Sequence, residues 1–327
     1  MGQQNLPKKR VTIKDIAKET GFTAQTVSLA LRKKDCITEK TRKTVLEAAR
    51  KLGYIKNDMA INLRRGHTNT IAIVYDNIAN PYFSLMTRYL QYYFREEGYV
   101  LLIFTADSYF LDQNTFHNIL SCNVAGVISF LDVDENIAKL SKQNNLPVLV
   151  LGRKSDKSIS WITTSENKGG ALAAKYLIGK GCKNNLHITY SLDMICGKER
   201  YEGFLNEIKS ADMKDDLLLV LGVDPVAPIL KEYLNEHEVD GIFAFNDMIA
   251  YATLNALKKL NREDIKVVGF DNIQEMFNFP IKINTISADK KAMAKTAVKV
   301  LLEKISKCDE RVEHRIFDVF LDSEDVE

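Results

Sequence analysis

The stretch TIKDIAKETGFTAQTVSLALR, residues 12–32, predicts two short helices joined by a tight turn. Within it, the small Ala17 lets a second helix cross the first closely, and Gly21 stands where the first helix needs a left-handed cap. Thr23 is placed to cap the second helix, whose Val27 then points back at the first. This spacing is typical of a helix-turn-helix, although an ordinary helical hairpin shares it.

The distribution of charge favours the helix-turn-helix over the plain hairpin. Residues 1–66 carry 16 Lys and Arg against 6 Asp and Glu, a net charge of +10, whereas the rest of the chain carries a net charge of −8. A small basic segment on an acidic body predicts a polyanionic partner for the basic segment alone. At a helix-turn-helix, that partner is expected to be nucleic acid.

A third helix is predicted between Thr38, which can cap it, and Gly53, which ends it. Its apolar residues lie on one side: Val45, Leu46, Ala48, Ala49 and Leu52. We therefore expect residues 1–57 to form an all-α three-helix head, with residues 1–10 as a basic arm.

A hinge helix and linker are predicted over residues 58–69. The helix, over about 58–64, is shorter than the ~12–15 residues that an isolated helix needs in water, so it should fold only on contact. Its apolar Leu63, beside Arg64 and Arg65, suits a wedge in a DNA minor groove. A plain linker is the alternative.

From residue 70 onward, apolar strand-like runs alternate with amphipathic helices, beginning with IAIVYD at 71–76 and a helix over 82–97. About ten such runs predict an α/β core of parallel sheets covered by helices on both faces. A break near 161–170 indicates two sheets, and ligands in such folds lie at the carboxyl ends of strands. The late helix at 290–307 could cross back to the first lobe, which the pattern alone does not decide. The expected limits are a core over 70–327, with lobe 1 at about 70–162 and 286–312, and lobe 2 at about 163–285 and 313–327.

Several function classes are disfavoured by missing features. No apolar run approaches the ~18 residues of a membrane span, and MGQQNLPKKR lacks the apolar core of a signal peptide, so we expect a cytoplasmic protein. The five cysteines and five histidines are scattered without metal-ligand spacing, which predicts neither a metal site nor a cofactor. The chain also lacks GxxxxGK[ST], GxGxxG after a strand, and GxSxG. An enzyme and a secreted solute-binding protein are therefore the less favoured alternatives.

Seven motifs in consistent order resemble the lactose/galactose-repressor family of bacterial transcription regulators. They are VTIKDIAKETGFTAQTVSLALR, TRKTVLEAARKLGY, NDMAINLRRG, IAIVYDNIANPYF, the Arg200–Gly203–Phe204 motif, FNDMIA and VVGFDN. The resemblance implies a helix-turn-helix DNA-binding head, a hinge helix and a two-lobed core like a periplasmic sugar-binding protein. It also implies that the core binds a small effector and dimerises.

The resemblance assigns a set of DNA-binding residues: Thr12, Ala24, Gln25, Thr26, Ser28, Leu29, Asn57, Ala60 and Leu63. Gln25 carries an amide that can pair bidentately with adenine, whereas Thr26 and Ser28 suit phosphate contacts. Leu29 departs from the family, because many members place Arg there. Leucine offers only apolar contact, for instance to a thymine methyl, so an operator different from the family's commonest sequence is expected.

The resemblance also assigns effector-binding residues: Asn77, Tyr82, Phe83, Arg153, Arg200, Asp247 and Asp271. Arg and Asp beside aromatic rings suit a sugar, because charged groups bind hydroxyls and aromatic faces cover the ring. A structural Arg200–Asp247 ion pair inside the lobe is the alternative, and Asp271 could equally cap a turn. The segment ITTSENKGG (162–170) departs from the family's usual acidic-Asn pattern at the lobe crossing.

The predicted function is that of a sequence-specific transcriptional regulator, expected to be a repressor. It would bind a pseudo-palindromic operator as a homodimer. A tetramer is not expected, because the C-terminal sequence has no leucine heptads. A small polar effector between the lobes, a sugar or sugar derivative, would control its affinity for DNA.

Overall fold

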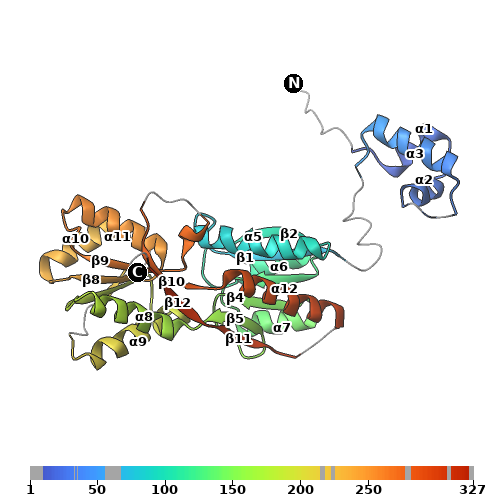
Figure 1. Cartoon of the computed structure of the whole chain (residues 1–327). Helices are drawn as coiled ribbons and strands as arrows, with labels where there is room; N and C mark the ends of the chain where they lie inside the picture. Colours follow the sequence, from blue (N-terminus) through green and yellow to red (C-terminus); the bar gives the residue numbers. More distant parts are fainter. Residues whose placement is uncertain are drawn as a thin grey trace, which may run out of the picture. The chain divides into compact units, whose positions relative to one another are not determined.

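The computed structural model divides into two compact units, Met1–His67 and Thr68–Glu327, shown in Figure 1. It describes residues 10–32, 34, 36–55, 68–213, 218–221, 225–276, 281–307 and 311–323. The predicted hinge helix, with Asn57, Ala60 and Leu63, lies outside these residues. None of the helices within them is long and apolar enough to cross a membrane.

The first unit contains the three predicted helices: α1 (Ile13–Thr20), α2 (Ala24–Leu31) and α3 (Glu39–Leu52). Gly21 ends α1 with φ +74°, in the left-handed region that favours glycine, and the Thr23 hydroxyl accepts a hydrogen bond from the Thr26 N–H at 3.1 Å. The three helices pack around a small core of fully or largely buried residues: Ile16, Val27, Ala30, Val45, Ala48 and Ala49. The predicted helix-turn-helix is therefore confirmed as a fold.

The first lobe of the second unit is a parallel six-stranded sheet in the order β11-β5-β4-β3-β1-β2. Its strands are β1 (Thr70–Tyr75), β2 (Val100–Thr105), β3 (Gly126–Ser129), β4 (Val148–Leu151), β5 (Ser160–Thr164) and β11 (His314–Phe317). Ile71 and Ile73 join one apolar cluster with two of the helices, α5 (Pro81–Glu96) and α12 (Lys290–Lys307). Ala72 and Val74 face the other way, towards α6 (Gln113–Ser121) and α7 (Glu135–Gln143). The alternation of side chains thus buries both faces of the sheet.

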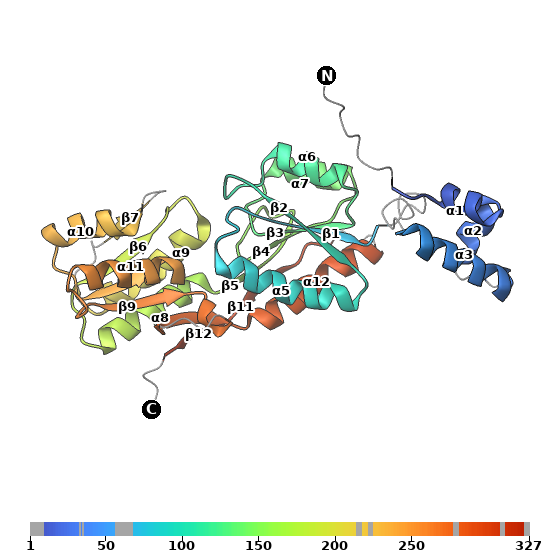
Figure 2. The same ribbon diagram turned by 90° about the horizontal axis from the view of Figure 1, so that it is seen from above.

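The second lobe repeats this plan in the order β12-β10-β9-β8-β6-β7, with only the β10–β12 pair antiparallel. Its strands are β6 (Asn185–Thr189), β7 (Leu218–Val220), β8 (Gly241–Ala244), β9 (Lys266–Phe270), β10 (Asn284–Ala288) and β12 (Val319–Asp322). Its helices are α8 (Glu166–Gly179), α9 (Ile195–Ser210), α10 (Val226–Glu236) and α11 (Asp247–Lys259). The first two cover one face of the sheet and the last two the other. Figure 2 shows the sheets of the two lobes from above.

The chain passes between the lobes at three places: after β5, after β10 and after β11. We expected the second lobe to resume near residue 313, but His314–Phe317 pairs in parallel with β5 of the first lobe, and the chain crosses only between Phe317 and Val319. A late strand was expected to accompany the helix at 290–307, but strands β10, β11 and β12 were not assigned to residues. The reason is that none of the three contains an apolar run longer than three residues, the longest being VFL at 319–321 in β12.

Candidate functional site

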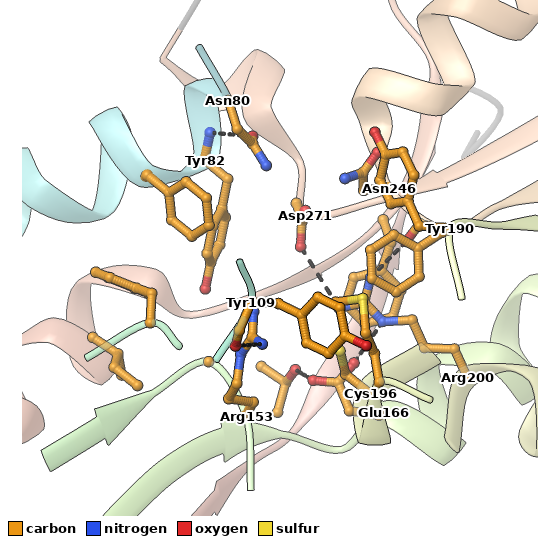
Figure 3. A pocket seen from close by; sticks show the side chains of 18 of the residues that line it. Asn80, Tyr82, Tyr109, Arg153, Glu166, Tyr190, Cys196, Arg200, Asn246 and Asp271 are labelled. Carbon is orange, nitrogen blue, oxygen red and sulfur yellow. Dashed lines mark hydrogen bonds and ion pairs between the residues drawn. The ribbon is translucent and has the colours of Figure 1, made fainter. Parts of the chain in front are cut away.

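A cavity of about 550 Å³ lies between the two lobes of the second unit (Figure 3). Residues that follow the strands of both sheets line it, among them Asp76 after β1, Tyr190 after β6 and Asp271 after β9. The carboxyl ends of parallel strands therefore meet at the cavity, as the sequence predicted. The volume suits one small ring-shaped molecule.

Aromatic side chains form the wall that the first lobe contributes. The Phe83 ring stacks on Tyr75 with centroids 5.1 Å apart and packs against Phe130 at 5.2 Å. Asn80 caps the start of α5, where its side chain accepts a hydrogen bond from the Tyr82 N–H at 3.0 Å. Burial strongly raises the pKa of the Tyr82 phenol, so its hydroxyl stays protonated and can donate a hydrogen bond.

Arg200, on α9, is the buried cation of the second lobe. Its Nε lies 2.6 Å from the Glu166 carboxylate, and its Nη1 donates to the Phe245 carbonyl at 2.5 Å. The guanidinium carbon lies 3.5 Å from the centroid of the Phe270 ring. Burial lowers the pKa of Arg200, but the negative charges of Glu166 and Asp271 outweigh burial and raise it overall. Arg200 is therefore a fixed positive charge whose Nε and Nη1 already donate to protein oxygens.

Glu166 was not among the predicted site residues. It begins α8, directly after the first lobe crossing, and its side chain is only 2% exposed. Its second carboxylate oxygen accepts hydrogen bonds from the hydroxyls of Thr164 at 2.5 Å and Thr163 at 3.3 Å. The segment ITTSENKGG, which departs from the family pattern, could have indicated Glu166. A carboxylate that becomes buried at a lobe crossing needs a hydrogen-bonding or charged partner.

Asp271 extends into the cavity from the turn after β9 (Figure 3). Its φ is +101°, a left-handed conformation in which a non-glycine residue is strained, and its N–H donates to the Ile286 carbonyl at 2.8 Å. One of its carboxylate oxygens lies 3.9 Å from Arg200 Nη2. Burial raises the pKa of Asp271 to about 7, against the opposing effect of the Arg200 charge. Asp271 is thus held as an acceptor beside a cation.

Asp247 lies outside the cavity wall, unlike the ligand-facing residue that we expected. It is fully buried at the start of α11, where its carboxylate accepts from the Ile273 N–H at 2.8 Å and from the Thr285 hydroxyl at 2.6 Å. Burial raises the pKa of Asp247 to about 7. The alternative Arg200–Asp247 ion pair is not formed either, since the carboxylates beside Arg200 are those of Glu166 and Asp271. Asp247 instead supports the turn that carries Asp271.

The structure brings together the other predicted effector residues along the cavity: Asn77, Tyr82, Phe83, Arg153, Arg200 and Asp271. Arg153 follows β4, and its polar contacts to described residues are long, 3.4 Å to the Tyr109 carbonyl and 3.7 Å to Asp132. Among the lining residues that sequence reasoning missed are Glu166, Tyr190, Phe245 and Lys290. Tyr190 and Phe245 directly follow strands, and this position could have identified them as candidate cavity residues.

In the described part of the first unit, the first turn of α2 is its most exposed part. Ala24 and Gln25 are exposed, whereas Thr26, Ser28 and Leu29 are half-buried. Thr12 lies exposed at the start of α1, where its N–H and hydroxyl both donate to Asp15 at 2.8 and 2.7 Å. Gln25 therefore has its amide free of the helical core, as a residue that reads DNA bases would need.

Comparisons with known proteins cover both units. Residues 12–57 match a family model described as "Bacterial regulatory proteins, lacI family", and residues 68–321 match "Periplasmic binding proteins and sugar binding domain of LacI family". The transcriptional repressor PurR of Aliivibrio salmonicida is 30% identical over 321 residues, which cover 94% of this chain and 96% of that protein.

Two solved structures share the fold. One is the lac repressor dimer bound to operator and an anti-inducer, with a TM-score of 0.79 and 21% identity over 96% of this chain and 98% of that one. The other is a regulator from Enterococcus faecium with bound ribose, with a TM-score of 0.69 and 23% identity over 78% of this chain and 97% of that one. At these identities the likeness is one of fold alone.

Proposed function

Because this chain belongs to the lacI family of bacterial regulatory proteins, we propose that a small polar effector, a sugar or sugar derivative, controls how tightly it binds its operator. The coarser function follows from the family: the chain is a DNA-binding transcriptional repressor with a ligand-binding core, and it is not an enzyme. The finer proposal concerns the effector and its action.

The observation that carries the proposal is Asp271 beside Arg200 in a cavity walled by aromatic rings. The carboxylate can accept hydrogen bonds from sugar hydroxyls, and rings such as Phe83 can cover an apolar sugar face. The bound ribose in the E. faecium regulator supports this choice, because that protein has the same two-lobed fold.

Control of DNA binding requires the effector to prefer one arrangement of the lobes. We propose that it does so by contacting both lobes, with Tyr82 on the first and Asp271 on the second. The residues assigned to the hinge, including Leu63, would then gain or lose their fit to a minor groove. A homodimer on a pseudo-palindromic operator, in the cytoplasm where the chromosome lies, completes the proposal. The lac repressor dimer on its operator supports it by analogy.

A nucleobase is the second candidate effector. Tyr82, Phe83 and Phe130 pack as a cluster of rings at the cavity, and such a cluster offers flat faces for a heteroaromatic ring as readily as for a sugar. Both candidates are uncharged rings that carry hydrogen-bonding groups.

The test uses the full chain. A preferred operator is selected from random DNA, and a thermal-shift screen then covers sugars, nucleobases, nucleosides and their phosphates. We expect a compound that raises the melting temperature to change operator affinity at least severalfold in fluorescence anisotropy. Asp271→Asn should weaken that response, and Gln25→Ala should alter DNA preference while leaving the thermal shift intact. A compound that binds the cavity without changing operator affinity would contradict the proposal.

A further inference from the structure

Among the described residues, the three cations that line the cavity each have a carboxylate partner. Arg200 lies 2.6 Å from Glu166, Lys290 lies 2.9 Å from Glu275, and Arg153 lies 3.7 Å from Asp132. The described part of the lining contains three cations and three carboxylates, so its formal charge is balanced. A ligand entering this cavity therefore meets paired charges rather than a net positive field.

Arg200 is the most completely engaged of the three. Its Nε is bound to Glu166, its Nη1 to the Phe245 carbonyl, and its Nη2 faces Asp271. The rings of Phe245 and Phe270 lie near its guanidinium group, with centroids 4.6 and 3.5 Å from its central carbon. A phosphate or carboxylate that pairs bidentately with Nε and Nη2 of Arg200 would have to displace Glu166, and one that pairs with Nη1 and Nη2 would compete with the Phe245 carbonyl and meet Asp271.

Glu166 is itself held firmly in place. Its other oxygen accepts from the hydroxyls of Thr164 and Thr163, and its side chain is 2% exposed. Displacing it would leave a buried carboxylate without its cation, which is costly in a low-dielectric interior. An anionic ligand would also meet the like charges of Glu166 and Asp271, whereas a hydroxyl or ring N–H can donate to either carboxylate without moving it.

We propose that Glu166 is a specificity-determining residue, which neutralises Arg200 and thereby restricts the cavity to uncharged effectors. The inference rests on the proposed function, in that it takes this cavity to be the effector site. It names the effector class: an uncharged polar ring, sugar or nucleobase, and not a sugar phosphate, a sugar acid or a nucleotide.

The experiment measures anion binding by the full chain at constant ionic strength, by calorimetry and thermal shift. The probes are inorganic phosphate and three matched pairs: ribose and ribose 5-phosphate, glucose and gluconate, adenine and AMP. Wild type should show no saturable binding of the anionic probes. Glu166→Gln keeps the shape of the side chain but frees Arg200 of its counter-charge, so it should bind phosphate and ribose 5-phosphate at least tenfold more tightly than wild type.

Two variants isolate the cause. Glu166→Gln with Arg200→Gln should lose the gained anion binding, because the cation is gone. Glu199→Gln removes a carboxylate from the same helix as Arg200, where it pairs with Lys154, and it should gain no anion binding despite the same change in net charge. A cooperative melting transition shows that each variant is folded.

Either of two results would overturn the inference. One is wild-type protein that binds an anionic probe as tightly as its uncharged partner or more tightly, a result that needs no variant. The other is a folded Glu166→Gln protein whose anion affinity equals that of wild type. Failure of the proposed function gives a different result, in which no uncharged compound changes operator affinity. The phosphate measurements on wild type and Glu166→Gln still decide the role of Glu166 in that case.

Discussion

Asp247 anchors the turn that presents Asp271 to the cavity. Its two carboxylate oxygens accept hydrogen bonds from the Ile273 N–H, two residues after Asp271, and from the Thr285 hydroxyl on β10. The same Thr285 hydroxyl oxygen receives the Asn272 N–H at 3.2 Å. The strained φ of Asp271 is therefore maintained by a buried network that does not itself touch the cavity.

We expect Asp247→Ala to destabilise the core and weaken ligand binding together. The change leaves the Ile273 N–H and the Thr285 hydroxyl without an acceptor, at a cost of about 1–3 kcal/mol for each buried group. Asp247→Asn should cost less, because the amide oxygen still accepts one bond. Urea denaturation and ligand calorimetry measure the two effects. As a control, Asp264→Asn removes an exposed acid beside Arg262 and should change neither quantity appreciably.

The titration of Asp271 predicts the direction in which the stability of the folded protein changes with pH. Its folded pKa of about 7 lies above the ordinary value of 3.8, so its stabilising contribution is present at low pH and is lost as the pH rises through 7. Asp271→Asn does not titrate. The melting temperature of Asp271→Asn minus that of wild type should therefore become more positive between pH 5 and pH 8. A flat or falling difference over that range would contradict the assignment.

His187 should show the opposite trend. It is fully buried in the second lobe, its Nδ1 lies 3.0 Å from the Phe243 carbonyl, and burial lowers its pKa to about 3. The contribution of neutral His187 to the stability of the folded protein is present above the ordinary pKa of 6.5 and is lost as the pH falls towards 3. The melting temperature of His187→Gln minus that of wild type should thus rise as the pH falls from 6.5 to 4.5, measured by the same thermal scans.

The backbones of α8 and α9 approach each other closely at Gly170 on α8 and at Gly203 on α9. A methyl group at Gly170 would lie 2.0 Å from the Arg200 carbonyl oxygen, and one at Gly203 would lie 1.8 Å from the Asn167 carbonyl oxygen. We expect Gly203→Ala to cost at least about 1–3 kcal/mol in urea unfolding and to weaken ligand binding, because α9 carries Arg200. Gly179→Ala, at the open end of α8, should be neutral or stabilising by up to about 1 kcal/mol. Equal effects of the two changes would refute the close helix crossing.

The parts of the fold that depend on neighbouring residues could be predicted from the sequence. The head helices begin directly after Thr12, Thr23 and Thr38 because each of these residues makes a local cap interaction, and α12 spans the predicted 290–307. Strand β11 could not be predicted, because its mostly exposed residues are ordered by β5, about 150 positions earlier. Edge strands gain their structure from pairing rather than from an apolar run.

The site divides in the same way. The position of Asp271 and Arg200 in the cavity could be predicted, because strand ends and motif residues converge in this topology. The role of Asp247 depends on Thr285, 38 residues later, and that partner cannot be read from a motif. Glu166 was missed because its importance comes from Arg200, which reaches it only after α8 and α9 pack together.

Substitution of Gln25 is the most direct test of whether the three-helix head recognises DNA bases. Its exposed amide on α2 can pair bidentately with adenine, a contact worth about 1–3 kcal/mol of discrimination. Gln25→Ala should lower affinity for the selected operator by about that amount and relax the preference at one base pair per half-site. Affinity for random DNA should remain unchanged, because the net charge of +10 over residues 1–66 is untouched and sets the salt dependence. Anisotropy titrations at several salt concentrations measure both quantities, with Gln143→Ala on α7 as the control. If Gln25→Ala weakens operator and random DNA equally, the residue contacts the backbone and does not read a base.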